Sequence, residues 1–261
     1  MFQTKKLLSA IALLGLSASL WAQSADEIIK KANLAAVYPG DDGRTEARMM
    51  IVDGQGRKQM RQFHILRRNV SKGGDQQYLV VFSQPADVAR TTFLVNKHPG
   101  RDDDRWLYLP GLDLVKRITA GDKRTSFVGS TFFYEDISGR DTAADSYSIE
   151  QDSGDSWLLK AVPKAKNAVE FAYFTVKIDK NNYLPVEATY YDNSGEAYRR
   201  ISASKIETIQ GYPTITQMKA ENLRDGSYTL NQMRGIKYDV GIPADIFSER
   251  SLRMPPSEWL K

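Results

Sequence analysis

Short apolar segments separated by tight, glycine-rich turns constrain the fold of this chain more than any other feature. The clearest case is "TEARMMIV", "DGQG", "RKQMRQFHIL" at 45–66, two extended segments around a hairpin turn, and similar turns recur at "DNSGE" and "RDGS". There are about eleven such segments, most of them separated by short connections. Parallel strands need crossovers of a dozen or more residues. The sequence therefore predicts a mainly β protein built on one antiparallel sheet.

The segment 169–179, "VEFAYFTVKID", is apolar on both of its faces. Read as a strand, it places Phe171 and Tyr173 on one side and Phe174 and Val176 on the other. A sheet with one face in water would alternate apolar and polar residues instead. We therefore expect cover on both faces of a strongly curved sheet. No linker, charge block or repeat interrupts the chain, so we expect a single domain.

The N-terminus has the features of a secretory signal peptide. Two lysines precede "LLSAIALLGLSASLWA", an apolar stretch that ends in small residues and is too short for a membrane span. Cleavage after Ala22 or after Ala25 fits this pattern. We favour Ala22, because Ser24 then remains to form a capping box with Glu27 at the start of an amphipathic helix. The predicted organisation is a signal peptide at 1–22 and one domain at 23–261.

The absence of cysteine limits the cellular compartments that fit this protein, and the distribution of charged residues limits its possible partners. The chain has no cysteine, so disulfides and a lipid anchor on a cysteine are excluded, and we expect an exported, freely diffusing periplasmic protein. Lysine and arginine number 36 against 32 acidic residues, and loss of the signal peptide removes two of the lysines. The charges are interspersed, so nucleic-acid binding is not expected.

The residues that carry most enzyme chemistry are scarce. There are two histidines, His64 and His98, far apart in sequence, and no GxSxG, P-loop or GxGxxG motif. The acidic run at 102–104 lacks the spacing of an EF-hand loop and fits a solvated turn better than a calcium site. We therefore expect no catalytic residues, no metal site and no cofactor.

The stretch "GSTFFYEDI" at 129–137 joins aromatic residues to two carboxylates. Glu135 and Asp136 could act as an acid and base pair, but glycosidase-type chemistry needs carboxyls that face each other, and neighbours on a strand point to opposite faces. The alternative is that Asp136 caps a turn while Phe132 and Phe133 are buried. We expect the carboxylates to anchor the turn that positions the two phenylalanines at the rim of a cavity.

Large aromatic residues recur along the predicted strands. A wide curved sheet with little helix to fill its concave side tends to leave a cavity, and an apolar cavity without catalytic groups suits a hydrophobic ligand. An ordinary core explains most of these residues equally well. The candidate ligand contacts are Trp106, Tyr108, Phe132, Phe133, Phe171, Tyr173 and Tyr190.

A locally basic segment, "LDLVKRITAGDKR", lies between these aromatic groups. Its basic side chains could contact lipid phosphates or an acidic partner surface. The alternative is a solvated face of two strands. The residues concerned are Lys116, Arg117, Lys123 and Arg124.

Four segments carry a resemblance to a known family. Together with the opening helix, "FSQPADVARTTFLV", "RWLYLPGLDLVKRI", "GSTFFYEDI" and "GIPADIFSERSL" resemble the LolA-like outer-membrane lipoprotein-sorting family, in particular its periplasmic branch associated with RND-type exporters. The resemblance covers nearly the whole chain after the signal peptide. It implies an incomplete β-barrel, with helices over its open side and a hydrophobic cavity for acyl chains.

The function that the resemblance implies is carriage rather than catalysis. We expect a monomer that takes lipoprotein or lipid cargo from an inner-membrane transporter, of RND type in this branch, and contacts membranes only transiently. A lipid-sensing or accessory protein of an RND-type exporter is the alternative. It ranks lower because RseB-like sensors carry a further C-terminal domain. An enzyme assembled from Glu135, Asp136 or His98 ranks third.

Overall fold

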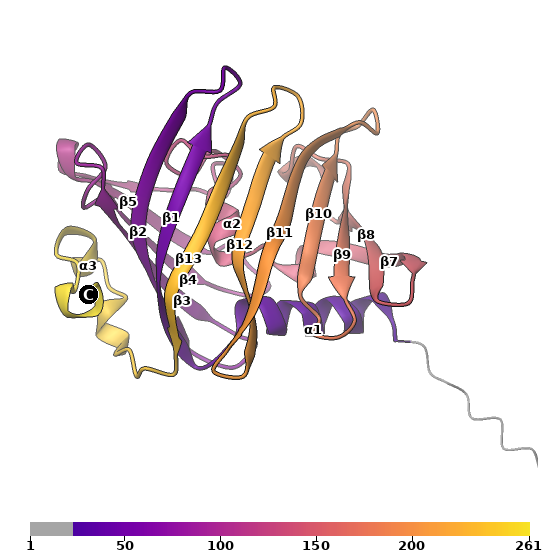
Figure 1. Cartoon of the computed structure of the whole chain (residues 1–261), viewed down its shortest axis with the longest axis horizontal. Coiled ribbons are helices and arrows are strands. Elements are labelled where there is room, and N and C mark those ends of the chain that lie inside the picture. Colours follow the sequence, from indigo (N-terminus) through magenta and orange to yellow (C-terminus); the bar gives the residue numbers. More distant parts are fainter. Residues whose placement is uncertain (1–22) are drawn as a thin grey trace, which may run out of the picture.

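The structure is a computed structural model that describes residues 23–261, so the predicted signal peptide lies outside the described residues. One 13-stranded sheet holds most of this range (Figure 1). The strands are β1 (Asp42–Val52), β2 (Lys58–Asn69), β3 (Gln76–Gln84), β4 (Thr92–Lys97), β5 (Asp104–Leu109), β6 (Leu114–Arg117), β7 (Asp145–Asp152), β8 (Ser156–Pro163), β9 (Tyr173–Asp179), β10 (Pro185–Tyr191), β11 (Ala197–Ile209), β12 (Tyr212–Asn222) and β13 (Tyr228–Tyr238). The α-helices are α1 (Ala25–Val37), α2 (Tyr134–Ser138) and α3 (Arg250–Arg253).

The sheet is antiparallel, curved and open, which confirms the predicted fold class. Its strand order is β6-β5-β4-β3-β2-β1-β13-β12-β11-β10-β9-β8-β7. Every neighbouring pair follows directly in sequence except β1 and β13, which join the two halves at the centre. The edges are therefore β6 and β7, and the connection 118–144 carries the chain from one edge to the other.

The strand count of about eleven was too low by the two edge strands. Strand β6 has four residues, mostly exposed, and β7 has the exposed pattern of an edge with little apolar alternation. Edge strands bury little apolar surface, so hydrophobic periodicity marks them weakly.

The predicted strand 169–179 is shorter than expected at its start. Strand β9 begins at Tyr173, so Phe171 is outside the strand and the alternation of faces does not apply to it. The chain instead folds back so that Phe171 packs edge-on against Phe174, with ring centroids 5.7 Å apart, and against Tyr190 at 5.2 Å. Phe171 and Phe174 therefore share one core cluster rather than lying on opposite faces.

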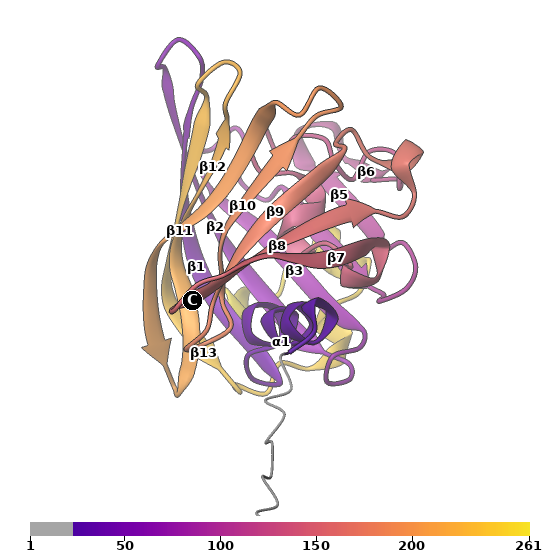
Figure 2. The ribbon, with the colours of Figure 1, turned by 90° about the vertical axis from the view of Figure 1, so that its right-hand side faces the viewer.

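Helix α1 covers one half of the concave face. Ser24 accepts a hydrogen bond from the backbone of Glu27, whose carboxylate accepts one from the backbone of Ser24, which confirms the predicted capping box. Ile28 and Ala32 face the sheet and pack in a buried cluster with residues of β8, β9 and β10. Figure 2 shows α1 nearly end-on, at one end of the curved sheet.

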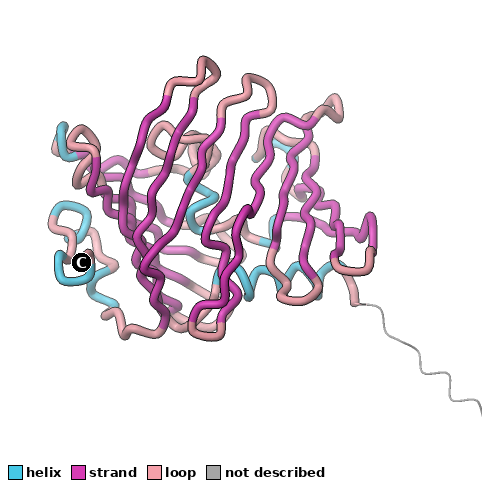
Figure 3. The backbone as a smooth tube through the Cα atoms, viewed as in Figure 1, coloured by secondary structure: helices cyan, strands magenta, loops and turns pink. Residues whose placement is uncertain are grey.

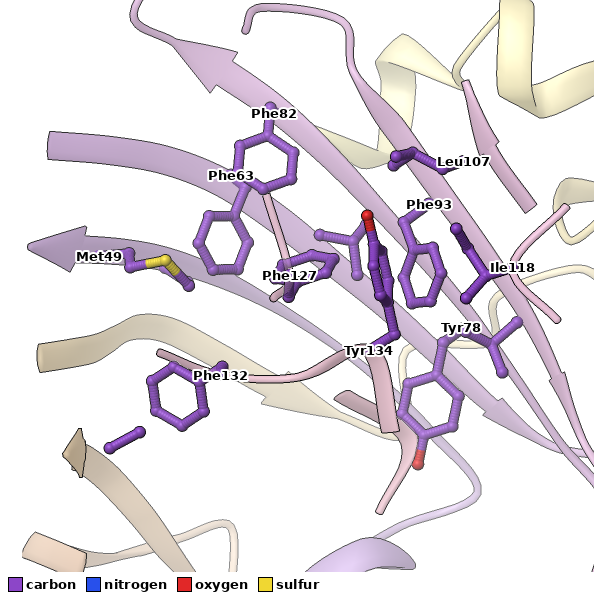
Figure 4. Close-up of a cluster of buried hydrophobic side chains, with 14 of the residues drawn as sticks. Met49, Phe63, Tyr78, Phe82, Phe93, Leu107, Ile118, Phe127, Phe132 and Tyr134 are labelled. Atoms are coloured by element: carbon purple, nitrogen blue, oxygen red, sulfur yellow. The ribbon is translucent and has the colours of Figure 1, made fainter. Parts of the chain in front are cut away.

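The connection 118–144 fills the other half of the concave face. Its apolar residues Ile118, Phe127, Phe132 and Tyr134 pack against β1 to β5. Figure 4 shows Phe127 among the rings of this cluster, with Phe93 at 5.4 Å and Tyr134 at 5.5 Å between centroids. The short helix α2 lies inside the curve of the sheet, in line with the expected helical cover (Figure 3).

Helix α1 and the connection 118–144 are the two covers of the concave face, and the C-terminal segment forms a third cover on the outer face of β2 to β5. Residues of the C-terminal segment, among them Ile242, Phe247 and Leu252, pack there against Leu66, Leu79 and other residues of these strands. Both faces of this part of the sheet are therefore buried. No helix within 23–261 has the length and apolar character needed to cross a membrane.

Candidate functional site

The two concave covers meet where the end of α1 approaches residues 139–144, and a cavity of about 350 Å³ remains between them and the centre of the sheet. The end of α1 and the residues 136–139 around the end of α2 form one wall, and β1, β2 and β10 to β13 form the other. Most lining side chains are aliphatic, including Ile65, Ile137, Leu184, Ile201, Met218 and Met233.

Strand register explains why this stretch is aliphatic and open. Ile201 on β11 lies opposite Ala188 on β10 and Ala220 on β12, and Ala203 lies opposite Met218. Small residues therefore alternate with medium-sized ones across the middle strands. No aromatic ring occupies these positions, and space is left between the middle strands and the covers.

A second cavity of about 540 Å³ opens at the hairpin end of the sheet. It lies between the β1–β2 turn, the β12–β13 turn and residues 129–133 of the connection 118–144, which we call the interior connection. Its lining is more polar and includes Arg199, Glu221 and Arg224. It suits water and polar groups better than an acyl chain.

A buried ion network separates the two core clusters. Arg124 contacts Glu135 at 2.7 Å and Glu170 at 2.7 Å, and Arg140 contacts Glu135 at 3.1 Å and Asp145 at 2.7 Å. The side chains of Arg124 and Glu135 are only 6% and 5% exposed. The network ties the interior connection to the far half of the sheet.

The electrostatics of Arg124 follow from these contacts. Burial by itself lowers the pKa of Arg124, but hydrogen bonding to Glu170 and the charge of Glu135 outweigh it and raise the pKa. Burial likewise raises the pKa of Glu170, and the hydrogen bond from Arg124 reverses this and lowers it. Both groups are therefore held in their charged forms.

Three of the predicted ligand contacts surround this network instead of lining the 350 Å³ cavity. The guanidinium of Arg124 lies over the rings of Phe171 at 4.7 Å, Tyr190 at 5.1 Å and Phe133 at 5.2 Å. Such cation–π contacts stabilise buried arginines. Phe133 also lines the second cavity.

The other four predicted contacts also lie away from the 350 Å³ cavity. Phe132, in the connection 118–144, is buried in the core against β1 to β5. Trp106 and Tyr108 pack on the outer face against the C-terminal segment. Tyr173 stacks on Tyr191 with centroids 4.6 Å apart. A role in ligand contact for these residues stays a prediction.

The four basic candidates divide by burial. Lys116 and Arg117 are exposed on the edge strand β6, and Arg117 pairs with Asp104 at 2.6 Å. Lys123 pairs with Asp102 at 2.6 Å. Arg124 lies inside the protein, in a connection rather than on a solvated strand face. Contact with phosphates or a partner stays a prediction for all four residues.

The two carboxylates of "GSTFFYEDI" lie in α2, not on a strand, which corrects the expected local geometry. Asp136 accepts a hydrogen bond from the backbone of Phe133 at 2.6 Å and pairs with Arg199, while Glu135 pairs with Arg124 and Arg140. The expectation that they anchor the turn is confirmed. Each carboxylate is held by arginine and neither faces the other across a cleft.

His98 and the acidic run have structural partners, and His64 is partly buried on β2. His98 contacts Asp75 at 2.8 Å and Asp104 at 3.3 Å, and burial lowers the pKa of His64. Asp103 is buried beside Arg105, so the run at 102–104 is not a simple solvated turn. Across the part of the chain that the structure describes, no three His, Cys, Asp or Glu side chains cluster as metal ligands.

Comparisons with known proteins identify the family. Residues 74–254 match a family model described as "-like: Uncharacterized protein". A DUF1329 family protein from Desulfovibrio piger superposes with a TM-score of 0.78 at 31% identity, over 86% of this chain and 97% of that one. This chain belongs to the DUF1329 family. No curated protein matches its sequence.

Two further solved structures relate this DUF1329 protein to lipoprotein-sorting folds. A putative outer membrane lipoprotein-sorting protein domain from Vibrio parahaemolyticus is 26% identical over 87% of this chain and 97% of its own length, with a TM-score of 0.78. A LolA superfamily protein from Nitrosomonas europaea, at 19% identity, covers 88% and 99% with a TM-score of 0.66 and shares the fold. The predicted resemblance to LolA-like proteins is confirmed.

Proposed function

We propose that this DUF1329 protein is a periplasmic, non-enzymatic carrier that binds an acyl chain of a lipoprotein or lipid in the 350 Å³ cavity. The observation that carries the proposal is the cavity itself, which is lined mostly by aliphatic side chains and lies between the sheet and its concave covers. The similarity to a putative lipoprotein-sorting domain agrees with this role.

The size and chemistry of the cavity suit one chain. A cavity of about 150 Å³ accommodates benzene, so 350 Å³ has room for a chain of about twelve carbons. Burying about twelve methylenes contributes roughly 10 kcal/mol before the cost of association. Apolar contact therefore offsets much of the cost of association, which is about 4–15 kcal/mol.

The signal peptide predicted at 1–22 supports a periplasmic location, where acylated cargo must cross an aqueous space. Glu135 and Asp136 are both engaged by arginines, which supports a role without catalysis. An inner-membrane transporter of RND type as the donor of the cargo is part of the proposal. Transfer of a labelled acyl peptide between donor and acceptor vesicles distinguishes a carrier from a lipid sensor.

The test compares two isoleucines on β11. Ile201 lines the cavity, whereas Ile206 on the same strand is 37% exposed and does not line it. We expect Ile201→Glu to abolish uptake of a fluorescent acyl probe, because a carboxylate in the apolar cavity is costly to bury. Ile206→Glu should bind as the wild type does.

Native mass spectrometry of protein purified without detergent provides the independent measurement. A bound lipid or acylated peptide that Ile201→Glu loses and Ile206→Glu retains agrees with the proposal. A wild-type protein that carries no lipid and takes up no acyl probe contradicts it.

A further inference from the structure

One wall of the 350 Å³ cavity contains a buried cation. Arg67 on β2 is 8% exposed and lines the cavity. Among residues 23–261 it forms no ion pair with a carboxylate. A charge buried without a counter-ion is strongly unfavourable, so its presence at an apolar cavity requires an explanation.

The hydrogen bonds of Arg67 leave most of its donors free. Nη1 donates to Oδ1 of Asn69 at 2.6 Å, and Nη2 donates to the carbonyl of Pro39. A guanidinium carries five N–H groups, so these bonds use two of them. Both acceptors are neutral, and neither compensates the charge.

The neighbours of Arg67 across the strands are also neutral. Tyr78 is its partner on β3, and its hydroxyl donates to Gln76. Gly43 is its partner on β1 and presents no side chain; a Cβ at that position would come within 3.0 Å of the Tyr238 ring. Burial raises the pKa of Tyr78 and of Tyr238, which keeps both hydroxyls uncharged.

The carboxylates that line the cavity do not serve Arg67. Asp136 is paired with Arg199. Glu187 is solvent-exposed on β10 and forms no ion pair among the described residues. No carboxylate of the lining therefore compensates Arg67, and Arg44 does not add to its charge, because Arg44 donates to the carbonyl of Lys261 in the C-terminal segment.

The other buried arginines show what is unusual about Arg67. Each of them contacts a carboxylate, in the pairs Arg105–Asp103, Arg124–Glu135, Arg140–Asp145 and Arg199–Asp136. Within 23–261, buried Lys97 also forms no ion pair, but it donates to the carbonyls of Ser138 and Gly139, and burial lowers its pKa to about 8. A guanidinium, unlike an ammonium, does not lose its charge in proteins, so a buried arginine depends more on a counter-ion than a buried lysine does.

We propose that the cavity binds a single-chain amphiphile with an anionic head group, whose carboxylate or phosphate pairs with the free N–H groups of Arg67. This inference rests on the proposed function, that the cavity takes an acyl chain, and adds the charge and chain number of the ligand. The aliphatic lining takes one chain of about twelve carbons, and the cation lies in the wall of the same space.

The test needs ligands of equal chain length and different head groups. Laurate, dodecyl phosphate, dodecan-1-ol and dodecyltrimethylammonium are titrated into the purified protein by calorimetry or by displacement of a fluorescent acyl probe. We expect laurate or dodecyl phosphate to bind most tightly, dodecan-1-ol more weakly and the cation most weakly. Whichever of laurate and dodecyl phosphate binds more tightly identifies the head group as a carboxylate or a phosphate.

Arg67→Gln then assigns the effect to this side chain. Loss of a charge-assisted hydrogen bond should weaken the preferred anion roughly tenfold to hundredfold and leave dodecan-1-ol unchanged. The matched control is Arg68→Gln, because Arg68 is the next residue on β2, also forms no ion pair in the described chain, and does not line the cavity. It should bind every ligand as the wild type does.

The outcomes separate this inference from the proposed function. Equal affinity of the wild type for laurate, dodecyl phosphate and dodecan-1-ol overturns the anionic head group but leaves acyl-chain binding standing. Binding of none of the four ligands overturns both. The comparison of head groups uses the wild type alone, so it decides the question even when Arg67→Gln does not fold.

Discussion

Replacing Arg124 with methionine tests how strongly the buried ion network stabilises the interior connection. The side chain is 6% exposed and contacts Glu135 and Glu170, each at 2.7 Å. Removing one partner of a buried pair costs about 3–5 kcal/mol, because the other charge stays buried. Arg140 still pairs with Glu135 and Glu170 is 43% exposed, so we expect the lower end, about 3 kcal/mol.

The assay is urea unfolding, supported by thermal melting, with Arg117→Met as the matched control. Arg117 also forms an ion pair, with Asp104 at 2.6 Å, but its side chain is 65% exposed. Surface pairs contribute about 1 kcal/mol or less. For a protein of this size, a loss of about 3 kcal/mol lowers Tm by roughly 6–12 °C. Equal losses in Arg124→Met and Arg117→Met refute the reasoning, since burial would then make no difference.

Three further outcomes follow from single contacts. The pKa of Glu170 is lowered, so the contribution of this carboxylate to stability is present above the ordinary glutamate pKa and is lost as pH falls through the lowered pKa. Acid unfolding curves should show this loss of stability in the wild type and not in Arg124→Met. The pKa of Lys97 is lowered to about 8, so the unfolded chain binds more protons than the folded chain between about pH 8 and the ordinary lysine pKa. The stability of the wild type should therefore rise over that pH range relative to that of Lys97→Met. Curves of stability against pH that run parallel for the two proteins contradict this expectation. Ser24→Ala should cost about 1 kcal/mol through loss of the helix cap, whereas Ser148→Ala at an exposed edge position should be neutral in the same urea series.

The sheet was predictable because residues close together in sequence determine its turns and its central strands. Glycine-rich turns such as "DGQG" fix hairpins, and Ser24 and Glu27 define the start of α1 through a two-residue contact. The edge strand β7 was not predictable in this way, because an edge buries little and its sequence has no strong alternation. Phe171 shows the same limit, since nothing within 169–179 signals that the strand begins at Tyr173.

The site was harder to predict because a cavity forms where side chains are missing. Large aromatic residues attract attention, yet Phe171 and Tyr190 fill space against arginines, and Tyr108 fills the outer face. The cavity is lined by ordinary residues such as Ile201 and Met218, which come together from separate strands. Their convergence depends on strand register, and Arg67 becomes unusual only when its lack of a partner is visible in three dimensions.

The pairing of β1 with β13 has a consequence for how this chain folds. All other neighbouring strands are also neighbours in sequence, but the hydrogen bond from Thr45 to Arg234 joins residues 189 positions apart. Closing so long a loop costs roughly 3 kcal/mol more than closing a hairpin. Two meanders can therefore form early and independently, while the centre of the sheet must wait for the last strand to be synthesised. The cavity lies across that central junction, so the binding site should be the last part of the protein to take shape.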